Sequence, residues 1–560
     1  SSSTGLDDQI SWILGKDIDS QNTTTGLIYR ENVLSDMMHS QPVAINYGGA
    51  STPDIRLVVG SNAGFLHMFK DNDSANTVSE SWAFIPYELL PKQRTLRVNA
   101  DGGAHVYGLD ATPVVYTTDT NGDGIISSSD GDKVWLFMGQ RQGGSNYYAF
   151  DITNPDSPVM MWQISGGSAG FERLAQTWST PQITKIPGYS KPVLIFGGGY
   201  NTGKDSLALG TNDSVGNAIY IVDAETGVLK FTVSPSGDLT NTDMHDSIAA
   251  PVKTVDYDSD GYTDIIYAAD TGGNVWRVDL PDSTQSHWSI SKFASVGSDL
   301  LRADDRRFFG QPLVVTYSNT EVTKDGSVYT FKKKPVRAVL LGSGDRNHPR
   351  TDTVVGNMYY MFRDYQLAPY AVSATKPATI TTSDLYDITS NPYGTAADDD
   401  ARKQILADIT AKRGWKYRMT GAGEKVFGSG VVSDGILYFS SFLPYATSGA
   451  NVCSVGNSIG TTRIYAIDLD LGFYPDGNKT AFTSYNDTIL ENLGVVVGAD
   501  KSVRLLTPVP DGSALDSNNV VKVDPITGKP VKCTGDAKCE IKKVGDNLPK
   551  IFKVYQAEQR

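Results

Sequence analysis

Histidine and cysteine are scarce in this sequence, which has 6 histidines and 3 cysteines in 560 residues. The histidines are scattered and show none of the short spacings with which side chains hold a metal ion. A histidine-based metal centre is therefore not expected, and we interpret most of these side chains as structural. The six are His39, His67, His105, His245, His287 and His348.

Basic residues and long apolar runs are also in short supply. The 49 lysines and arginines are outnumbered by 63 acidic residues, which gives a net charge of −14 and a pI near 4.9. This charge opposes binding to nucleic acid or anionic lipid. The nearest basic cluster, Lys332 to Lys334, is interpreted as a solvated hairpin tip. No apolar run approaches the roughly 20 residues of a membrane helix, so membrane insertion is not expected.

The amino terminus, SSSTGLDDQ, lacks a basic segment followed by an apolar one. Either a signal has been removed or the sequence is part of a larger protein. Cys533 and Cys539 enclose a five-residue loop that suits a disulfide in an oxidising compartment, with Cys453 left over. Three free thiols are the alternative, because connectivity does not follow from sequence.

Glycine and tyrosine are plentiful, at 55 and 28 residues, while charged residues make up only 20%. This composition favours short strands joined by tight turns. A phrase with a small residue, an aromatic residue and alternating apolar residues returns six times, with the period-two pattern of a half-buried strand. The copies begin at Gly64, Ser145, Gly216, Gly272, Gly356 and Thr461.

A second phrase, usually with proline before an apolar run, precedes each copy. Proline suits the first residue of a strand, where its missing donor costs no ladder bond. The five prolines recur at intervals of 61 to 71 residues, and the sixth copy, at Gly428, lacks one. The prolines are Pro42, Pro113, Pro181, Pro251 and Pro312.

These repeats predict an all-β fold, a β-propeller, because four-stranded units cannot bury both faces alone and close into a ring when packed radially. Six units are clear. A seventh can combine the C-terminal NLGVVVGADKSVRLLT and PKIFKVYQ with the N-terminal DQISWIL. We therefore expect one propeller domain over residues 1–560, with seven blades.

Residues 365–425 depart from the repeat. The stretch ADDDARKQILADITAKRGW, from Ala397, has acidic residues first, basic residues last and apolar residues at helical spacing. We predict a partly helical insertion between blades, packed on the propeller rim.

The stretch DYDSDGYTD contains four carboxylates in nine residues. Alternate side chains of such a loop converge on one point, the glycine at position 6 takes the sharp turn, and position 7 offers its carbonyl, as in calcium loops. An Asp-rich turn without an ion is the alternative. The predicted calcium ligands are Asp256, Asp258, Asp260, Tyr262 and Asp264.

A similar stretch, DTNGDGIISSSD, follows the second proline phrase, with Gly124 at position 6. Strand patterns flank both stretches, so both loops are expected on the first hairpin of their blades, without helices around them. Hard oxygen donors in a flexible loop favour calcium over softer metals. The predicted ligands of this second, less specific site are Asp119, Asn121, Asp123, Ile125, Ser127 and Asp130.

Two short stretches resemble catalytic or phosphate-binding motifs, but the sequence around each does not fit the motif. GGSAG around Ser168 lacks the strand-turn-helix surroundings of a nucleophile elbow, and Asp205 stands where a phosphate-binding loop needs serine or threonine. IVDAETGVLKF and VDPITGKPVKC resemble the repeat of quinoprotein dehydrogenase propellers, which makes a quinone-dependent periplasmic oxidoreductase the enzyme alternative. Those enzymes typically stack their cofactor on an adjacent-cysteine disulfide, and this chain has no adjacent cysteines. We therefore expect a quinoprotein-like fold without catalysis.

VLSDMMHSQPVAI, LYDIT and GEKVFGSGVVSDGILYFSSFLP, together with the calcium loop, resemble the C-terminal domain of the PilC/PilY family of type IV pilus adhesins. The resemblance implies a secreted protein that passes through the periplasm to the pilus tip or cell surface. It implies roles in pilus biogenesis, in opposing retraction, in twitching motility and in adhesion to host or abiotic surfaces. It also implies that calcium at the DYDSDGYTD loop controls retraction.

The resemblance also implies partners among the other pilus components, pilin and the minor pilins. An Arg-Gly-Asp tripeptide, linked to integrin binding in some members, is absent from this sequence. Integrin binding is therefore not expected. The larger N-terminal region of such adhesins is also missing, which favours the interpretation as part of a larger protein.

Overall fold

The computed structural model describes residues 3–22, 26–31, 33–72, 75–99, 103–209, 212–444, 460–475, 481–486, 490, 493–497, 503–506 and 542–543. Contacts divide the chain into two compact units, and each is described by itself. The first unit comprises Ser1–Lys185, Tyr189–Thr202 and Asp213–Val252. The second unit comprises Ile186–Gly188, Gly203–Asn212 and Lys253–Arg560. All three cysteines lie outside the described residues.

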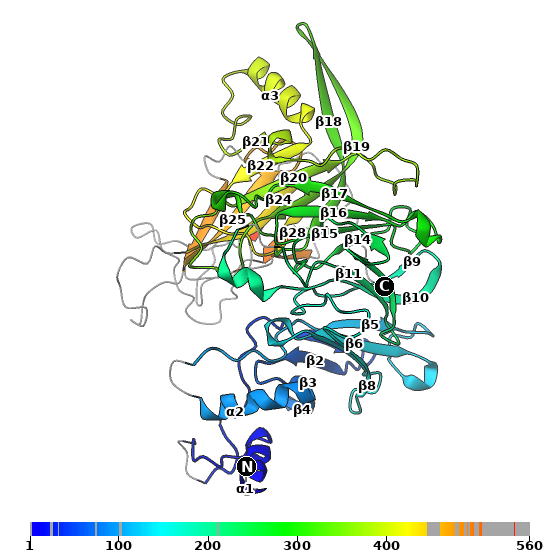
Figure 1. Ribbon diagram of the computed structural model, residues 1–560, viewed down its shortest axis with the longest axis vertical. Helices are drawn as coiled ribbons and strands as arrows, with labels where there is room; N and C mark the ends of the chain where they lie inside the picture. Colours follow the sequence, from blue (N-terminus) through cyan, green and yellow to red (C-terminus); the bar gives the residue numbers. More distant parts are fainter. Residues whose placement is uncertain are drawn as a thin grey trace, which may run out of the picture. The chain divides into compact units, whose positions relative to one another are not determined.

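The first three sheets belong to the first unit, apart from the turn between β9 and β10 (Figure 1). Two have four antiparallel strands in chain order, and the third has five. Their strands are β1 (Val43–Asn46), β2 (Ile55–Gly60), β3 (Leu66–Asn72), β4 (Thr77–Phe84), β5 (Val114–Thr118), β6 (Lys133–Gly139), β7 (Asn146–Asp151), β8 (Val159–Ser165), β9 (Gln182–Ile186), β10 (Tyr189–Gly197), β11 (Ile219–Asp223), β12 (Leu229–Ser234) and β13 (Leu239–Thr240).

The second unit contains the remaining sheets, ordered β14-β15-β16-β17, β18-β19-β20-β22-β21, β23-β24-β25-β26 and β27-β28-β29. Their strands are β14 (Lys253–Val255), β15 (Ile265–Ala269), β16 (Asn274–Asp279), β17 (Ser289–Ser295), β18 (Leu313–Asp325), β19 (Val328–Gly342), β20 (Met358–Asp364), β21 (Tyr386–Asp387), β22 (Gly414–Arg418), β23 (Val431–Ser433), β24 (Ile436–Pro444), β25 (Gly460–Asp468), β26 (Phe482–Asn486), β27 (Gly494–Val497), β28 (Val503–Leu506) and β29 (Lys542–Lys543).

The two repeated phrases fall on equivalent strands of six sheets. The proline phrase leads into the first strand of each sheet, and the aromatic phrase forms the third strand. Most residues of the third strands are buried, and in β16 all six are. The expected repeat of a strand, a turn, a strand and an aromatic strand is therefore confirmed.

Neighbouring sheets pack face to face through aromatic and apolar side chains. In the first unit, the rings of Tyr147 on β7 and Phe196 on β10 lie 4.5 Å apart in one buried cluster. In the second unit, Tyr359 on β20 stacks on Phe439 of β24 at 3.9 Å. Such aromatic pairs add to the stability that comes from burying their area. Within each unit, these two pairs of neighbouring sheets thus bury apolar side chains between their facing surfaces.

Seven sheets lie in the part of the chain that the structure describes, six with four or five strands and one with three. The C-terminal contribution to the seventh sheet is present as β27 and β28, while PKIFKVYQ lies outside the described residues. The expected N-terminal strand DQISWIL is wrong, because helix α1 (Ser3–Ile13) occupies this stretch. Leu6, Ile10 and Leu14 recur every fourth residue, which is helical spacing.

The predicted helix is confirmed as α3 (Asp399–Ala411), whose first turn is capped by Asp398; its carboxylate accepts the Ala401 amide at 2.8 Å. The expectation that 365–425 is an insertion between blades is wrong, because the same stretch supplies β21 and β22, which complete the sheet of β18. A further helix, α2 (Leu90–Val98), follows β4. Among the described residues, no helix is long and apolar enough to cross a membrane.

Lys332 to Lys334 do not form a hairpin tip. The β18–β19 hairpin turns at Gly326, whose φ is +58°, and the three lysines lie along β19 several residues after the turn. The error has a simple source, because sequence shows a basic run but not how far a strand continues on either side of it.

Candidate metal-binding loops

The DYDSDGYTD loop joins β14 to β15 in the second unit, as predicted for a first hairpin. One carboxylate oxygen from each of Asp256, Asp258 and Asp260 lies within 4.8 Å of the others, and all three side chains are exposed. Among the described residues, this is the one group of three or more acidic, histidine or cysteine side chains that gathers so closely. The alternate positions 1, 3 and 5 therefore converge, as their spacing predicted.

Backbone amides shape this loop around its first carboxylate. Asp256 accepts the amides of Ser259 at 2.7 Å and Gly261 at 2.8 Å, one on each oxygen. Asp260 accepts the amide of Tyr262 at 2.8 Å. Gly261 has a φ of +89°, which glycine adopts without strain. The turn is thus held by side chains that accept from its own backbone, and sequence correctly placed the glycine.

Asp264 closes the loop and is buried, unlike the other three carboxylates. It accepts the amide of Tyr257 at 2.7 Å. Burial, together with the negative charges of Asp258, Asp256 and Asp260, raises the pKa of Asp264 to about 6. The structure places Asp264 beside the group as an organiser of the loop, and places Tyr262 two residues after Asp260, with its amide on the Asp260 carboxylate.

The loop between β5 and β6, in the first unit, repeats this arrangement. Asp119 accepts the amides of Gly122 and Gly124, each at 2.8 Å, and Asp123 accepts the amide of Ile125 at 2.8 Å. The same hydrogen bonds occur in the first loop. In both loops the aspartate at position 1 accepts the amides at positions 4 and 6, and the aspartate at position 5 accepts the amide at position 7. The sequence comparison of the two loops is therefore matched by a shared backbone conformation at positions 1 to 7.

Asp132 is a loop residue that the sequence analysis missed. Its two carboxylate oxygens accept the amides of Thr120 at 2.7 Å and Ser127 at 2.9 Å, and its side chain is buried. These two hydrogen bonds lower the pKa of Asp132. A carboxylate immediately before the second strand of the sheet, at the same place as Asp264, was the signal available in the sequence.

The remaining predicted residues of the second loop do not all converge on one point. Asn121 donates from its amide nitrogen to Asp123 at 3.1 Å and Asp130 at 3.4 Å. The hydroxyl of Ser127 lies 2.6 Å from that of Ser129. Asn121, Asp123 and Asp130 are thus neighbours, while the Ser127 side chain bonds elsewhere. This loop therefore resembles the first at its start and differs after position 7.

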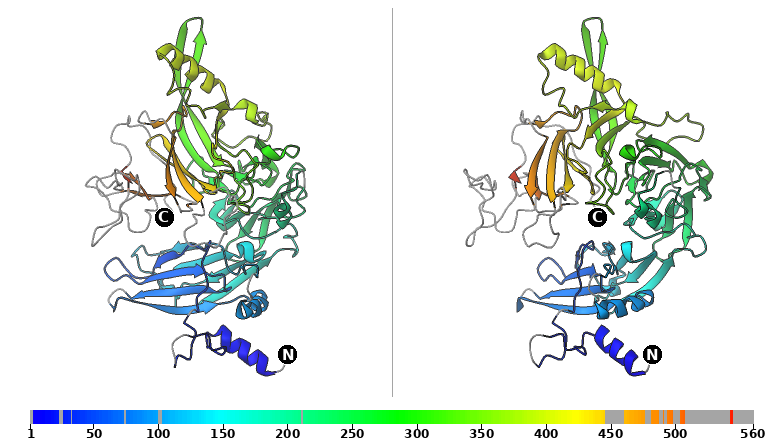
Figure 2. Two further views of the ribbon diagram at one scale, coloured as in Figure 1. Left: turned by 90° about the vertical axis from the view of Figure 1, so that its left-hand side faces the viewer. Right: turned by 60° about the vertical axis from the view of Figure 1, so that its left-hand side comes forward.

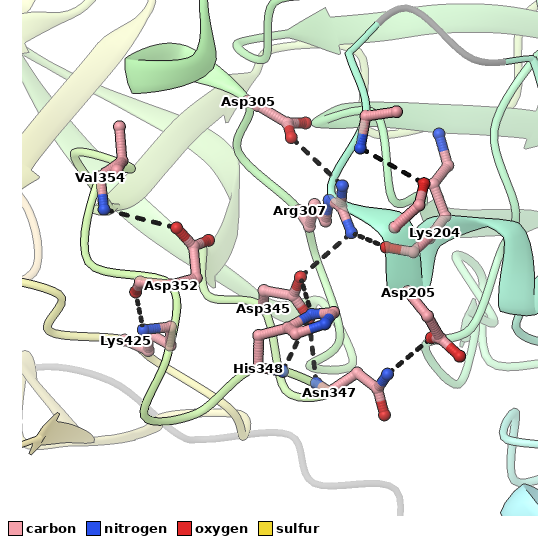
Figure 3. Close-up of polar contacts among 12 residues, drawn as sticks. Lys204, Asp205, Asp305, Arg307, Asp345, Asn347, His348, Asp352, Val354 and Lys425 are labelled. Atoms are coloured by element: carbon pink, nitrogen blue, oxygen red, sulfur yellow. Dashed lines mark hydrogen bonds and ion pairs between the residues drawn. The ribbon is translucent and has the colours of Figure 1, made fainter.

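A separate buried polar cluster surrounds Arg307 in the second unit (Figure 3). Its guanidinium donates to Asp345 at 3.0 Å and to the Lys204 carbonyl at 2.8 Å. The ring of His348 donates to Asp345 at 2.9 Å, and this hydrogen bond raises the pKa of His348. Nearby, buried Lys425 donates to the carbonyl of Asp352, and burial lowers its pKa to about 8. The basic groups are thus paired with acceptors in a structural network.

The family model of the PilY1 beta-propeller domain matches residues 14–381, which is more than half of the chain. This chain belongs to the PilY1 β-propeller family. The fold is accordingly a β-propeller, which agrees with the successive sheets described above. Both acidic loops, 119–132 and 256–264, lie inside the matched range.

Curated relatives in the PilY1 family are named as type IV pilus biogenesis factors. The chain is 29% identical over 293 residues to PilY1 of Pseudomonas aeruginosa (strain UCBPP-PA14), covering 48% of this chain and 22% of that protein. It is 24% identical over 443 residues to a PilY1 homolog of Xylella fastidiosa (strain Temecula1 / ATCC 700964), covering 76% and 27%. The chain thus spans less than a third of the length of these relatives.

The crystal structure of the Pseudomonas aeruginosa PilY1 C-terminal domain has the same fold. The TM-score is 0.54 at 18% identity, over 81% of this chain and 90% of that one. The resemblance to the C-terminal domain of this family, drawn from sequence motifs, is confirmed.

Proposed function

We propose that this chain is a noncatalytic, calcium-binding propeller of a type IV pilus-associated protein that supports pilus biogenesis and regulates extension and retraction. The observation that carries the proposal is the convergence of Asp256, Asp258 and Asp260 on one point, within 4.8 Å, in a chain of the PilY1 family. Twitching motility and surface adhesion follow as cellular consequences of the same role. The protein acts at the pilus tip or cell surface after export.

The residues of the first loop fit a hard cation. Its converging donors are all carboxylate oxygens, which calcium prefers, and three negative charges this close repel one another without a counter-ion. Calcium would supply the positive charge that neutralises them. Asp256, Asp258 and Asp260 would hold it, with the Tyr262 carbonyl and Asp264 at the further ligand positions. Extracellular calcium modules bind with a Kd on the order of 10⁻⁴ to 10⁻³ M.

The second loop is proposed as a weaker calcium site. Asp119, Asn121 and Asp123 share the conformation of the first loop, but a neutral amide replaces one carboxylate. Fewer negative charges lower the affinity for a cation. With calcium bound, both loops would hold a fixed conformation. The residues around them would then contact pilin or minor pilins, the proposed partners.

The first experiment titrates calcium and magnesium into the purified chain by calorimetry. We expect calcium to bind more tightly than magnesium, and Asp256→Asn with Asp258→Asn to abolish the tighter site. Asp299→Asn, which removes an exposed carboxylate outside both loops, is the control for loss of surface charge. Heat of calcium binding that is unchanged in the double variant contradicts the assignment of this loop.

The cellular experiment places the same variants in a strain that lacks the full-length protein. Wild type and Asp299→Asn should restore pili and twitching, and the double variant should restore pili whose retraction no longer responds to calcium removal. Identical retraction in all three would contradict regulation by this loop. The quinone-dependent alternative stays a prediction, which the absorbance of purified protein tests directly.

A further inference from the structure

The β18–β19 hairpin runs past the rest of its sheet. β19 pairs with β20 only from Arg337 onward, whereas residues 328–336 pair with β18 alone. Figures 1 and 2 both show the two strands continuing beyond β20 to the turn. An extended hairpin of this kind has two edges, each with a row of backbone groups that the hairpin itself does not satisfy.

The edge formed by β18 is covered within the chain. The amide of Thr320 donates to the Asp470 carboxylate at 3.1 Å, and the amide of Val322 donates to the Thr410 hydroxyl at 3.1 Å. Helix α3, which carries Thr410, packs against β18. In the part of the chain that the structure describes, no strand pairs with the outer edge of β19 over residues 328–336.

The pairing register shows which amides β19 presents. Residues directly opposite each other in an antiparallel pair either both turn their amides inward or both turn them outward. Lys333 lies opposite Thr320 and Phe331 lies opposite Val322, whose amides point outward. The amides of Phe331 and Lys333 therefore point to the open edge, as does that of Tyr329. Pro335, the next outward position, has no donor and ends the row.

The open edge carries positive charge in an acidic protein. Lys332, Lys333 and Lys334 are exposed and form no ion pair with another described residue, although Lys333 donates to the Thr320 hydroxyl at 2.5 Å and Lys334 lies 4.7 Å from the Tyr365 ring centroid. Beside them Phe331 is 51% exposed. Lysines on an edge strand normally prevent pairing between like edges, because a second copy brings its own lysines close. The same lysines favour a strand of opposite charge.

We propose that the edge of β19 from Tyr329 to Lys333 binds an extended, acidic segment of another pilus component by strand addition. This rests on the proposed function, because it names a partner surface for the same pilus role. The outward amides supply main-chain hydrogen bonds, Phe331 supplies apolar contact, and the lysines select acidic side chains. Charge complementarity decides the occupant, since it opposes a second copy of this chain.

The experiment uses the whole chain and two synthetic eight-residue peptides, one alternating glutamate with valine and one alternating lysine with valine. Binding is measured by fluorescence anisotropy, with Phe331→Pro and Phe331→Ala as a matched pair. Both substitutions remove the aromatic ring of Phe331, but only proline removes the outward backbone amide. We expect the glutamate peptide to bind Phe331→Ala at least about tenfold more tightly than Phe331→Pro. Equal affinities, or equal binding of the lysine peptide, overturn the proposal.

Two further measurements separate the alternatives. Lys332→Glu with Lys334→Glu should reverse the peptide preference, and an unchanged preference overturns the charge argument. Sedimentation that shows a dimer lost in Phe331→Pro overturns the choice of partner. In the cellular strain, failure of wild type to restore pili contradicts the proposed function itself. If wild type and Phe331→Pro restore pili equally well, the result contradicts only the proposed binding at the β19 edge.

Discussion

Asp132 and Asp264 hold corresponding places in two different sheets. Each directly precedes the second strand of its sheet, and each accepts the amide of the second residue of its loop, Thr120 or Tyr257, at 2.7 Å. Their pKa values shift in opposite directions, because two amide hydrogen bonds lower the pKa of Asp132, whereas burial, together with the neighbouring carboxylates, raises the pKa of Asp264. The shared contact shows that a buried carboxylate closes both loops.

Asp132→Asn should therefore weaken calcium binding at the second loop by about tenfold, the lower end of the effect of residues that position metal ligands. One amide oxygen cannot replace both carboxylate oxygens for Thr120 and Ser127. Hydrogen exchange of these two amides and calorimetric titration measure the change. Asp130→Asn, which changes the exposed residue predicted as the ligand at position 12, is the comparison variant. If Asp130→Asn loses more calcium affinity than Asp132→Asn, then the residue at position 12 of the loop, and not Asp132, contributes more to calcium binding.

The loops show what spacing can and cannot predict. Positions 1, 3, 5 and 6 form a local turn, in which side chains accept from amides two to five residues away, so sequence offsets suffice. The loop from Asp119 then includes the short helical turn Ser128–Asp130 before returning to β6. An inserted turn moves the closing carboxylate from position 9 to position 14. Its place is set by where the strand begins, which a fixed offset does not contain.

Glu424, in the segment GEKVFGSG between β22 and β23, binds side chains of β24 and β25. Its buried carboxylate accepts from Arg463 at 2.7 Å and from Ser441 and Tyr465, each at 2.5 Å. Glu424→Ala should lower the free energy of unfolding by about 3 kcal/mol, because it leaves the buried partners uncompensated. Urea unfolding of the whole chain measures this loss.

The control for Glu424 is a surface ion pair. Lys191 lies 3.0 Å from Glu225, and both side chains are well exposed. Glu225→Ala should leave the urea midpoint almost unchanged, since exposed pairs contribute little. Comparable losses in the two variants would contradict a special role for the Glu424 contacts.

His348 should make the stability of the second unit depend on pH. Asp345 raises the pKa of His348 above 6.5, so its contribution is complete below pH 6.5 and is lost as pH rises through the folded value. Burial opposes ionisation of Asp345, but His348 and Arg307 lower its pKa overall. Its contribution is therefore present above pH 3.8 and is lost as pH falls through the folded value.

His348→Gln should consequently destabilise the protein more at pH 6 than at pH 8.5, as measured by urea unfolding at both values. His287→Gln is matched, because His287 also binds an aspartate, Asp282 at 2.7 Å, but both side chains are largely exposed. Its effect should be small at either pH. A pH-independent effect of His348→Gln would show that the ring acts by packing alone.

The fold was more predictable than its termini. Strands such as β16 are predictable from sequence because a turn, an aromatic residue and apolar residues recur in six sheets. DQISWIL was misjudged because Ile10, Trp12 and Leu14 alternate as in a strand, while Leu6, Ile10 and Leu14 also follow helical spacing. Seven residues satisfy both periods, so only tertiary contacts decide. Here Arg30 lies 3.9 Å from the Trp12 ring and fixes the helix end.

Thr410→Val should loosen the covered edge of the long hairpin. The Thr410 hydroxyl is the acceptor for the Val322 amide, and valine keeps the shape while removing that acceptor. Losing one buried hydrogen bond costs about 1 kcal/mol, so exchange of the Val322 amide should accelerate about fivefold. Exchange of the Leu340 amide, in the part of β19 that also pairs with β20, should stay unchanged. Equal acceleration at both amides would mean that α3 stabilises the whole sheet and does not specifically cover the β18 edge.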